Sequence, residues 1–99
     1  MKEKLCKLII DVAGELNENL DPPIRLEGGE DAPLYGPDGR LSSLGLVSLI
    51  IAVEQAIEEQ FGVAITLADE RSFSLSQSPF RNVGALADYA NTLLIEHRG

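Results

Sequence analysis

The sequence predicts an all-α fold, an up-and-down bundle of four helices in which one helix is short and a long loop follows the first. Two observations predict this class. Apolar residues recur at steps of three and four in three separate stretches, the spacing that gives a helix one apolar face. Prolines, glycines and helix-capping residues lie between those stretches. With 99 residues, 44% of them hydrophobic, the chain suffices for one modest core, so we expect a single domain over residues 1–99.

The first predicted helix is amphipathic and covers residues 2–20. Its apolar positions are Leu5, Leu8, Ile9, Val12, Leu16 and Leu20. The helix should stop near Asp21, because Pro22 biases the residue before it away from helical angles. Cys6, the only cysteine, cannot form an internal disulfide, and its place in this helix predicts a small buried side chain rather than a reactive thiol.

The many prolines and glycines of residues 21–41 predict a long loop. A loop of this length inside a small domain is usually either functional or mobile. Its acidic residues are expected to form a solvated surface, because they lack the regular oxygen-ligand spacing of a calcium-binding loop, and no metal site is predicted. These residues are Glu27, Glu30, Asp31 and Asp38.

The second predicted helix, over about residues 43–60, is the most apolar of the chain. Ser42 or Ser43 is a natural N-cap for it, and Gly62 is a natural C-cap, since glycine readily takes left-handed angles. One apolar stripe contains Leu46, Leu49, Ile50, Val53, Ile57 and Phe61. Val47 and Ile51 widen this stripe, so we expect much of the helix to be buried.

Two further helices are predicted in the last third of the chain. After the apolar crossover 63–65, Thr66 is placed to cap a short helical turn through Glu70. Asn82 then caps a final helix. The residues of this helix that are expected to face inward are Val83, Leu86, Ala87, Ala90, Leu93 and Leu94.

The charge balance favours protein partners. Eight basic and 16 acidic residues give a net charge of -8, which repels nucleic acid and anionic membranes and attracts basic protein surfaces. No long apolar run follows the charged start 1–4, so neither a secretory signal nor membrane insertion is predicted. We expect a cytoplasmic protein, and a monomer is the simplest state for a small acidic domain.

The start of the second helix carries a resemblance to a known family. Ser43-Leu44 opens a helix that continues through Val47, Val53 and Phe61, and the whole chain, with its long loop and short crossover, resembles the acyl carrier proteins, whose signature is Asp-Ser-Leu. The resemblance implies that Ser43 carries 4′-phosphopantetheine, which a phosphopantetheinyl transferase attaches from coenzyme A. The thiol of that arm holds acyl groups as thioesters for an acyl-loading ligase and for acyltransferase or synthase enzymes.

Other residues receive roles from the same resemblance. The expected partner contacts are Leu44, Val47, Glu54, Glu58 and Glu59. The expected acyl pocket is lined by Val53, Ile57, Ile65 and Leu94, residues for which ordinary core packing is the alternative interpretation. A carrier makes no bonds of its own, so no catalytic residue is predicted. The sequence also shows no nucleophile–base–acid set and no cluster of metal ligands.

The chain departs from the family pattern beside the serine. Ser42 stands where the family has Asp, while Gly45 and Ser48 stand where members that serve fatty acid biosynthesis often have acids. The second helix is also longer by about one turn, roughly four residues. These departures favour a specialised carrier in a lipid, polyketide or cell-envelope pathway. The alternative is an unmodified carrier-fold module for protein–protein interaction, since a serine pair before a helix is usually only an N-cap.

Overall fold

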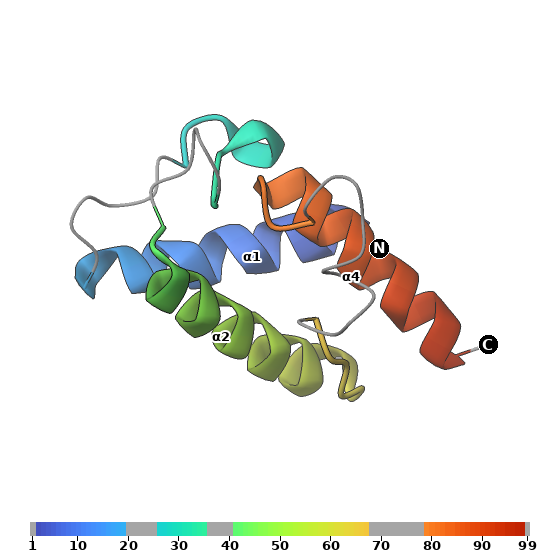
Figure 1. The fold of residues 1–99 in the computed structure, drawn as a ribbon. Helices are drawn as coiled ribbons and strands as arrows, with labels where there is room; N and C mark the ends of the chain where they lie inside the picture. The colour runs from blue at the N-terminus through green and yellow to red at the C-terminus, as the bar shows by residue number, and fades with distance from the viewer. Residues whose placement is uncertain (1, 20–25, 36–40, 68–78, 99) are drawn as a thin grey trace.

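Three α-helices make up most of the described chain in the computed structural model (Figure 1). The structure describes residues 2–19, 26–35, 41–67 and 79–98. The α-helices are α1 (Lys2–Leu16), α2 (Ser43–Phe61) and α4 (Val83–Arg98), and two 3-10 turns are η1 (Asn17–Asn19) and η2 (Gly29–Asp31). Within those ranges the β pairing is a single isolated bridge between Pro33 and Asn82. The all-α class is therefore confirmed for this part of the chain.

α1 is the helix that contacts both of the other α-helices. It packs against both α2 and α4. α1 and α2 run side by side in opposite directions, and α4 crosses α1 near the beginning of α1 (Figure 1). Apolar side chains of all three helices meet in one core, together with Leu34 of the long loop and Leu67 of the segment after α2. The largest fully buried side chains of this core are Leu5, Ile9, Leu34, Leu49, Ile57, Leu67, Leu86, Val53 and Val83.

The predicted bounds of α2 are confirmed to within one residue. Ser42 is the N-cap, with extended backbone angles, and its hydroxyl accepts a hydrogen bond from the Gly45 N–H. At the other end Gly62 has φ of 68° and ψ of 19°, and its N–H donates to the Glu58 carbonyl. A left-handed residue at this position favours glycine, because a Cβ would be strained there.

α1 ends earlier than predicted. The α-helix stops at Leu16, and the chain continues as the 3-10 turn η1 to Asn19. Asparagine is a poor residue for a helix interior because its side chain competes for nearby backbone hydrogen bonds, and last turns often tighten to 3-10 geometry. Leu20 and the predicted stop at Asp21 lie outside the described residues.

α4 begins where the sequence predicts. The Asn82 side-chain oxygen accepts from the Ala85 N–H at 2.7 Å, which is the geometry of an N-cap. The predicted inward residues of α4 are buried, except that Leu93 is only partly so. The short helix predicted after Thr66 lies outside the described residues from residue 68 onward, whereas Leu67 is described and fully buried.

The long loop is tied to the entrance of α4 by backbone hydrogen bonds. The Leu34 N–H donates to the Arg81 carbonyl at 3.0 Å, and the Val83 N–H donates to the Ala32 carbonyl at 3.1 Å. Leu34 is fully buried in the core, as is Ala32. These contacts hold residues 32–35 against a segment nearly fifty positions later in the sequence, close to where η2 meets α4 (Figure 1).

An ion-pair cluster joins three segments on the same side of the molecule. The Lys2 Nζ lies 3.1 Å from the Glu30 Oε1 and 3.1 Å from the Asp88 Oδ1, which connects α1, η2 and α4. Hydrogen bonds to Glu30 and Asp88 raise the pKa of Lys2 above its ordinary value. All three side chains are substantially exposed, so solvent and salt screen the attraction.

Candidate functional site

The candidate site is the junction between the long loop and α2, where two serines are adjacent. Ser43 is the first residue of α2, and its side chain lies outside what the structure describes. The Ser42 Oγ accepts from the Gly45 N–H at 3.1 Å, and the Ser42 carbonyl accepts from the Leu46 N–H at 2.9 Å. Ser42 therefore has the capping role, a choice between the two serines that the sequence left open.

The chain is anchored immediately before this junction. Leu41 is buried, and its N–H donates to the Leu34 carbonyl at 3.1 Å. On the other side, the capping bond of Ser42 and the first turn of α2 define the backbone. The backbone of Ser43 is thus held from both directions.

The N-terminal end of α2 has no acidic residue in its own first turn to compensate the helix dipole. The first N–H groups of a helix lack intrahelical partners, and they make that end partly positive. A negatively charged group attached here, such as a phosphate ester, would be stabilised by the helix end.

An exposed apolar stripe begins next to Ser43. Leu44 is 82% exposed, Val47 51% and Ile51 50%, and they are three of the four exposed large hydrophobic residues in the described part of the chain. We call these three residues the apolar stripe. The prediction that Val47 and Ile51 widen the buried face is wrong.

Helix geometry explains that error. Ile51 is two residues from both Leu49 and Val53, which are fully buried, so it lies about 200° away from each around the helix axis. A residue in that position must face away from the core side. The signal was present in the sequence, because the spacing of the apolar residues alone places Ile51 and Leu44 on a second face.

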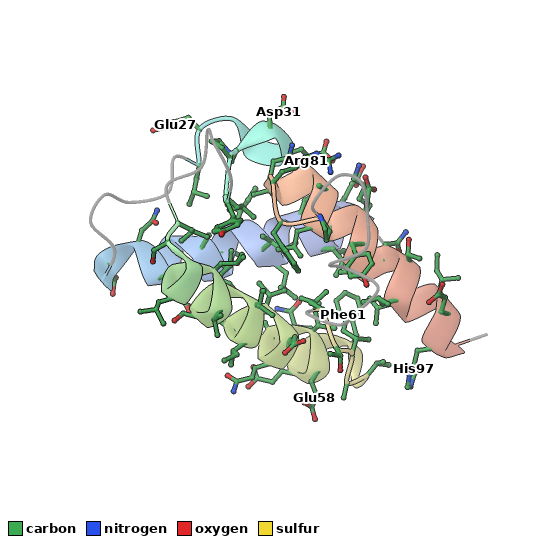
Figure 2. All side chains as sticks on the ribbon, in the orientation of Figure 1. Glu27, Asp31, Glu58, Phe61, Arg81 and His97 are labelled. Carbon is green, nitrogen blue, oxygen red and sulfur yellow. The ribbon has the colours of Figure 1, made fainter. Side chains whose placement is uncertain are left out.

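The three acids predicted as partner contacts fall into two groups. Glu58 and Glu59 are exposed in the last turns of α2, and Figure 2 shows Glu58 pointing away from the bundle. Glu54 is only partly exposed, and its Oε2 accepts from the Leu67 N–H at 2.6 Å. Glu54 therefore holds the crossover segment after α2, a role that the sequence analysis did not include.

The four residues predicted to line an acyl pocket lie in or against the common core. Val53 and Ile57 are fully buried, Leu94 is 2% exposed, and Ile65 packs against this core at its edge. A surface hollow of about 320 Å³ is lined by Ile65 together with residues of α4. Only Ile65 of the four lines that hollow, whereas Val53, Ile57 and Leu94 are buried in the core.

Cys6, the cysteine of α1, lacks the features of a reactive thiol. Cys6 is buried, with its Sγ 3.6 Å from the Glu30 Oε1. Burial is the larger cause, and the hydrogen bond to Glu30 the second, of a pKa of the Cys6 thiol that is raised above its ordinary value. A protonated buried thiol is a weak nucleophile.

The structure brings no group of three or more histidine, cysteine, aspartate or glutamate side chains into a metal-binding arrangement in the ranges that it describes. The helices of those ranges are too short or too polar to cross a membrane.

A scan against protein-family models and searches of curated proteins and of solved structures found no match to this chain.

Proposed function

We propose that this chain is a carrier protein that holds acyl groups as thioesters on a 4′-phosphopantetheine arm attached to Ser43. One observation carries the proposal. Ser43 begins α2 between a neighbour that supplies the helix cap and a leucine that is 82% exposed. Because Ser42 already caps the helix, the local structure assigns no capping role to Ser43. Because Leu44 is so exposed, core packing does not account for it either.

The proposed attachment is a phosphoryl-group transfer. The Ser43 hydroxyl attacks the phosphorus of coenzyme A that bears the pantetheine, and a base of the transferase takes the hydroxyl proton. A new P–O bond forms to Ser43 as the P–O bond of the pyrophosphate breaks, and adenosine 3′,5′-bisphosphate leaves. The product carries a phosphodiester at the positive end of α2, where a helix favours an anion.

The finer parts of the proposal concern architecture and pathway. We propose the four-helix carrier arrangement, with a short helix between α2 and α4, for a monomeric cytoplasmic protein. The neutral residues beside Ser43 favour a dedicated loading ligase and acyltransferase or synthase in a specialised lipid, polyketide or cell-envelope pathway. The alternative function is an unmodified interaction module, and its support is that Ser42 stands where carriers have an aspartate.

The intact mass of the purified protein tests the proposal. The protein is incubated with coenzyme A and a broad-specificity phosphopantetheinyl transferase, beside the variants Ser43→Ala, Ser42→Ala and Ser48→Ala. We expect one added phosphopantetheine on the wild type, Ser42→Ala and Ser48→Ala, and none on Ser43→Ala. If several transferases add nothing to folded, initially unmodified protein, the interaction module becomes the better explanation.

A further inference from the structure

We propose that two copies of this chain associate reversibly through α1, with their α1 helices side by side in opposite directions. The surface is a row of five charged residues that we call the charged row: Lys4, Lys7, Asp11, Glu15 and Glu18. This inference goes beyond the proposed function and does not depend on the modification of Ser43. The monomer of the proposed function is the dissociated state, which dominates at micromolar concentration.

The charged row faces away from the core. Steps of three or four residues separate its members, so at about 100° per residue they lie on one side of α1. The opposite side carries Leu5, Ile9 and Ala13, which are fully buried. Glu18 lies in η1, where three residues make one 3-10 turn, so it stays on the side of Glu15. All five residues of the charged row are exposed.

The order of charges along α1 opposes the dipole of that helix. Lysines lie near its partly positive beginning and glutamates near its partly negative end, whereas acids first and bases last would compensate the dipole. Glu3 is acidic in the first turn, but Lys2 and Lys4 outnumber it, and the last turn has no base. In the part of the chain that the structure describes, the ion pairs of α1 involve Lys2 and leave the charged row unpaired.

The charged row is complementary to itself when one copy is turned around. Lys7 and Glu15 each lie four residues from Asp11, and Lys4 and Glu18 each lie seven residues from it. Two antiparallel rows centred on Asp11 therefore place each Lys7 opposite the other copy's Glu15, and each Lys4 opposite its Glu18. A two-fold axis makes both contacts twice, as an isologous interface requires. The two α1 dipoles then also lie in opposite directions, so unlike ends approach each other.

The contact is polar, so it is weak and reversible. The large hydrophobic residues that are exposed in the described part of the chain lie on α2 and α4, and none lies on the charged row. Exposed ion pairs contribute little individually, and salt screens them. With two lysines and three acids the charged row has a net charge of -1, against -8 for the chain, so repulsion at this face is small. We expect dimers at high protein concentration.

Two neutralising variants should have opposite effects on the dimer. Because the chain is acidic, removing any carboxylate lowers the general repulsion between two copies. Glu15→Gln should nevertheless raise the Kd of the dimer about twofold to tenfold, since Lys7 of the other copy loses its partner. Asp11→Asn should lower the Kd about twofold to fivefold, since two carboxylates meet at the axis. Glu27→Gln is the matched control, an exposed acid of the long loop whose removal should not raise the Kd.

Sedimentation equilibrium measures the association in salt of about 0.1 M, where charges more than about 10 Å apart are largely screened. The weight-average mass of the wild type should rise with protein concentration from the monomer value of 10.7 kDa toward twice that value. Salt of about 1 M should return it to the monomer value. Lys4→Glu/Lys7→Glu should stay monomeric at every concentration, and so should Glu15→Lys/Glu18→Lys, because each change replaces attraction with repulsion.

Complementary variants separate specific pairing from a general effect of charge. A mixture of the two double variants should form a heterodimer, because one charged row is then acidic and the other is mainly basic. The variant that carries all four changes should associate with itself as the wild type does, within about threefold in Kd, but not with the wild type. Its charges suit the helix dipole, so it should not be less stable than the wild type, which urea unfolding checks.

Three results would overturn the inference. One is a wild-type mass that stays at the monomer value up to millimolar protein. Another is an association that Val47→Ser/Ile51→Ser abolishes and Lys4→Glu/Lys7→Glu leaves intact, which would assign it to the apolar stripe of α2. The third is an association that becomes stronger with salt, because ion pairs across the charged row require the reverse. The modification of Ser43, measured by intact mass, is independent of all three.

Discussion

Ser42 and Ser43 are adjacent hydroxyl residues for which the structure predicts separable roles. Replacing Ser42 with alanine removes the oxygen that accepts from the Gly45 N–H at 3.1 Å. Replacing Ser43 leaves that capping bond in place, because Ser43 is already inside the helix. The first variant should therefore affect stability, and the second should affect modification.

The expected size of the stability effect follows from the cap. Exchanging an N-cap serine for alanine typically costs about 1 kcal/mol, within a range of about 0.5–2 kcal/mol. For a domain of this size, about 1 kcal/mol corresponds to a decrease in Tm of about 4–8 °C. Ser43→Ala should change the free energy of unfolding by less than about 0.5 kcal/mol, since alanine is a good helix former.

Two further variants at the cap sharpen the comparison. Ser42→Asn retains an oxygen that can accept from the Gly45 N–H, so it should restore most of the lost stability. Ser42→Asp also caps, and it places a carboxylate at a helix end that has no acid in its first turn, so it should be at least as stable as the wild type. Thermal unfolding followed by circular dichroism, with urea titrations beside it, measures all four variants.

The same four proteins are then tested for phosphopantetheine addition by intact mass. We expect every variant except Ser43→Ala to be modified. The reasoning is refuted if Ser43→Ala is as destabilised as Ser42→Ala, because the capping assignment would then be wrong. It is equally refuted if Ser42→Ala prevents modification under conditions in which it remains folded.

Three other predictions concern two glycines in different surroundings, two glutamates of α2 and the buried thiol of Cys6. Gly14→Ala should add about 0.5–1 kcal/mol to the free energy of unfolding, because the added methyl group meets only a side-chain atom, at 3.9 Å. Gly84→Ala should be less stable than Gly14→Ala, because its methyl group would lie 3.1 Å from the Glu30 carbonyl oxygen in η2. Urea titrations of both variants test this order. Glu54→Ala should lower the free energy of unfolding by about 1–3 kcal/mol, because the partly buried Leu67 N–H loses its acceptor. Glu58→Ala should lower it by less than about 0.5 kcal/mol. The opposite order in denaturant unfolding would contradict the role given to Glu54. Cys6 should react slowly with a disulfide reagent until the protein unfolds, because its thiol is buried. The pKa of Cys6 is raised in the folded state above its ordinary value of 9.0, so its contribution to stability should be lost as the pH rises from 9.0 through the folded pKa. Unfolding measured as a function of pH tests this loss.

Much of the helical architecture followed from local signals. The caps Ser42, Gly62 and Asn82 act on N–H or carbonyl groups within three or four residues, so they are readable in one short window. Periodicity likewise identified the buried side of α2. Local signals were weaker at the end of α1, where α-helical and 3-10 geometry differ little in energy and the last turn tightened after Leu16.

The candidate site was partly predictable for the same reason. The sequence placed a serine and a leucine at the beginning of a helix, and the structure confirms that position of Ser43 and the exposure of Leu44. Treating the apolar residues of α2 as a single stripe concealed the exposure of Ile51, although the angle around the helix contains that information. The covalent state of Ser43 is a matter of enzymology and stays a prediction.

The sequence by itself determined where most helices begin and end, because those choices depend on neighbours within one turn. Tertiary structure alone decided that Glu54 holds the Leu67 N–H, while Glu58 stays exposed on the same helix. It also decided that Lys2 joins Glu30 to Asp88. These contacts join residues between 13 and 86 positions apart. Such pairs exist only once the apolar faces of the helices have packed and brought distant segments together, so no pattern within a short window predicts them.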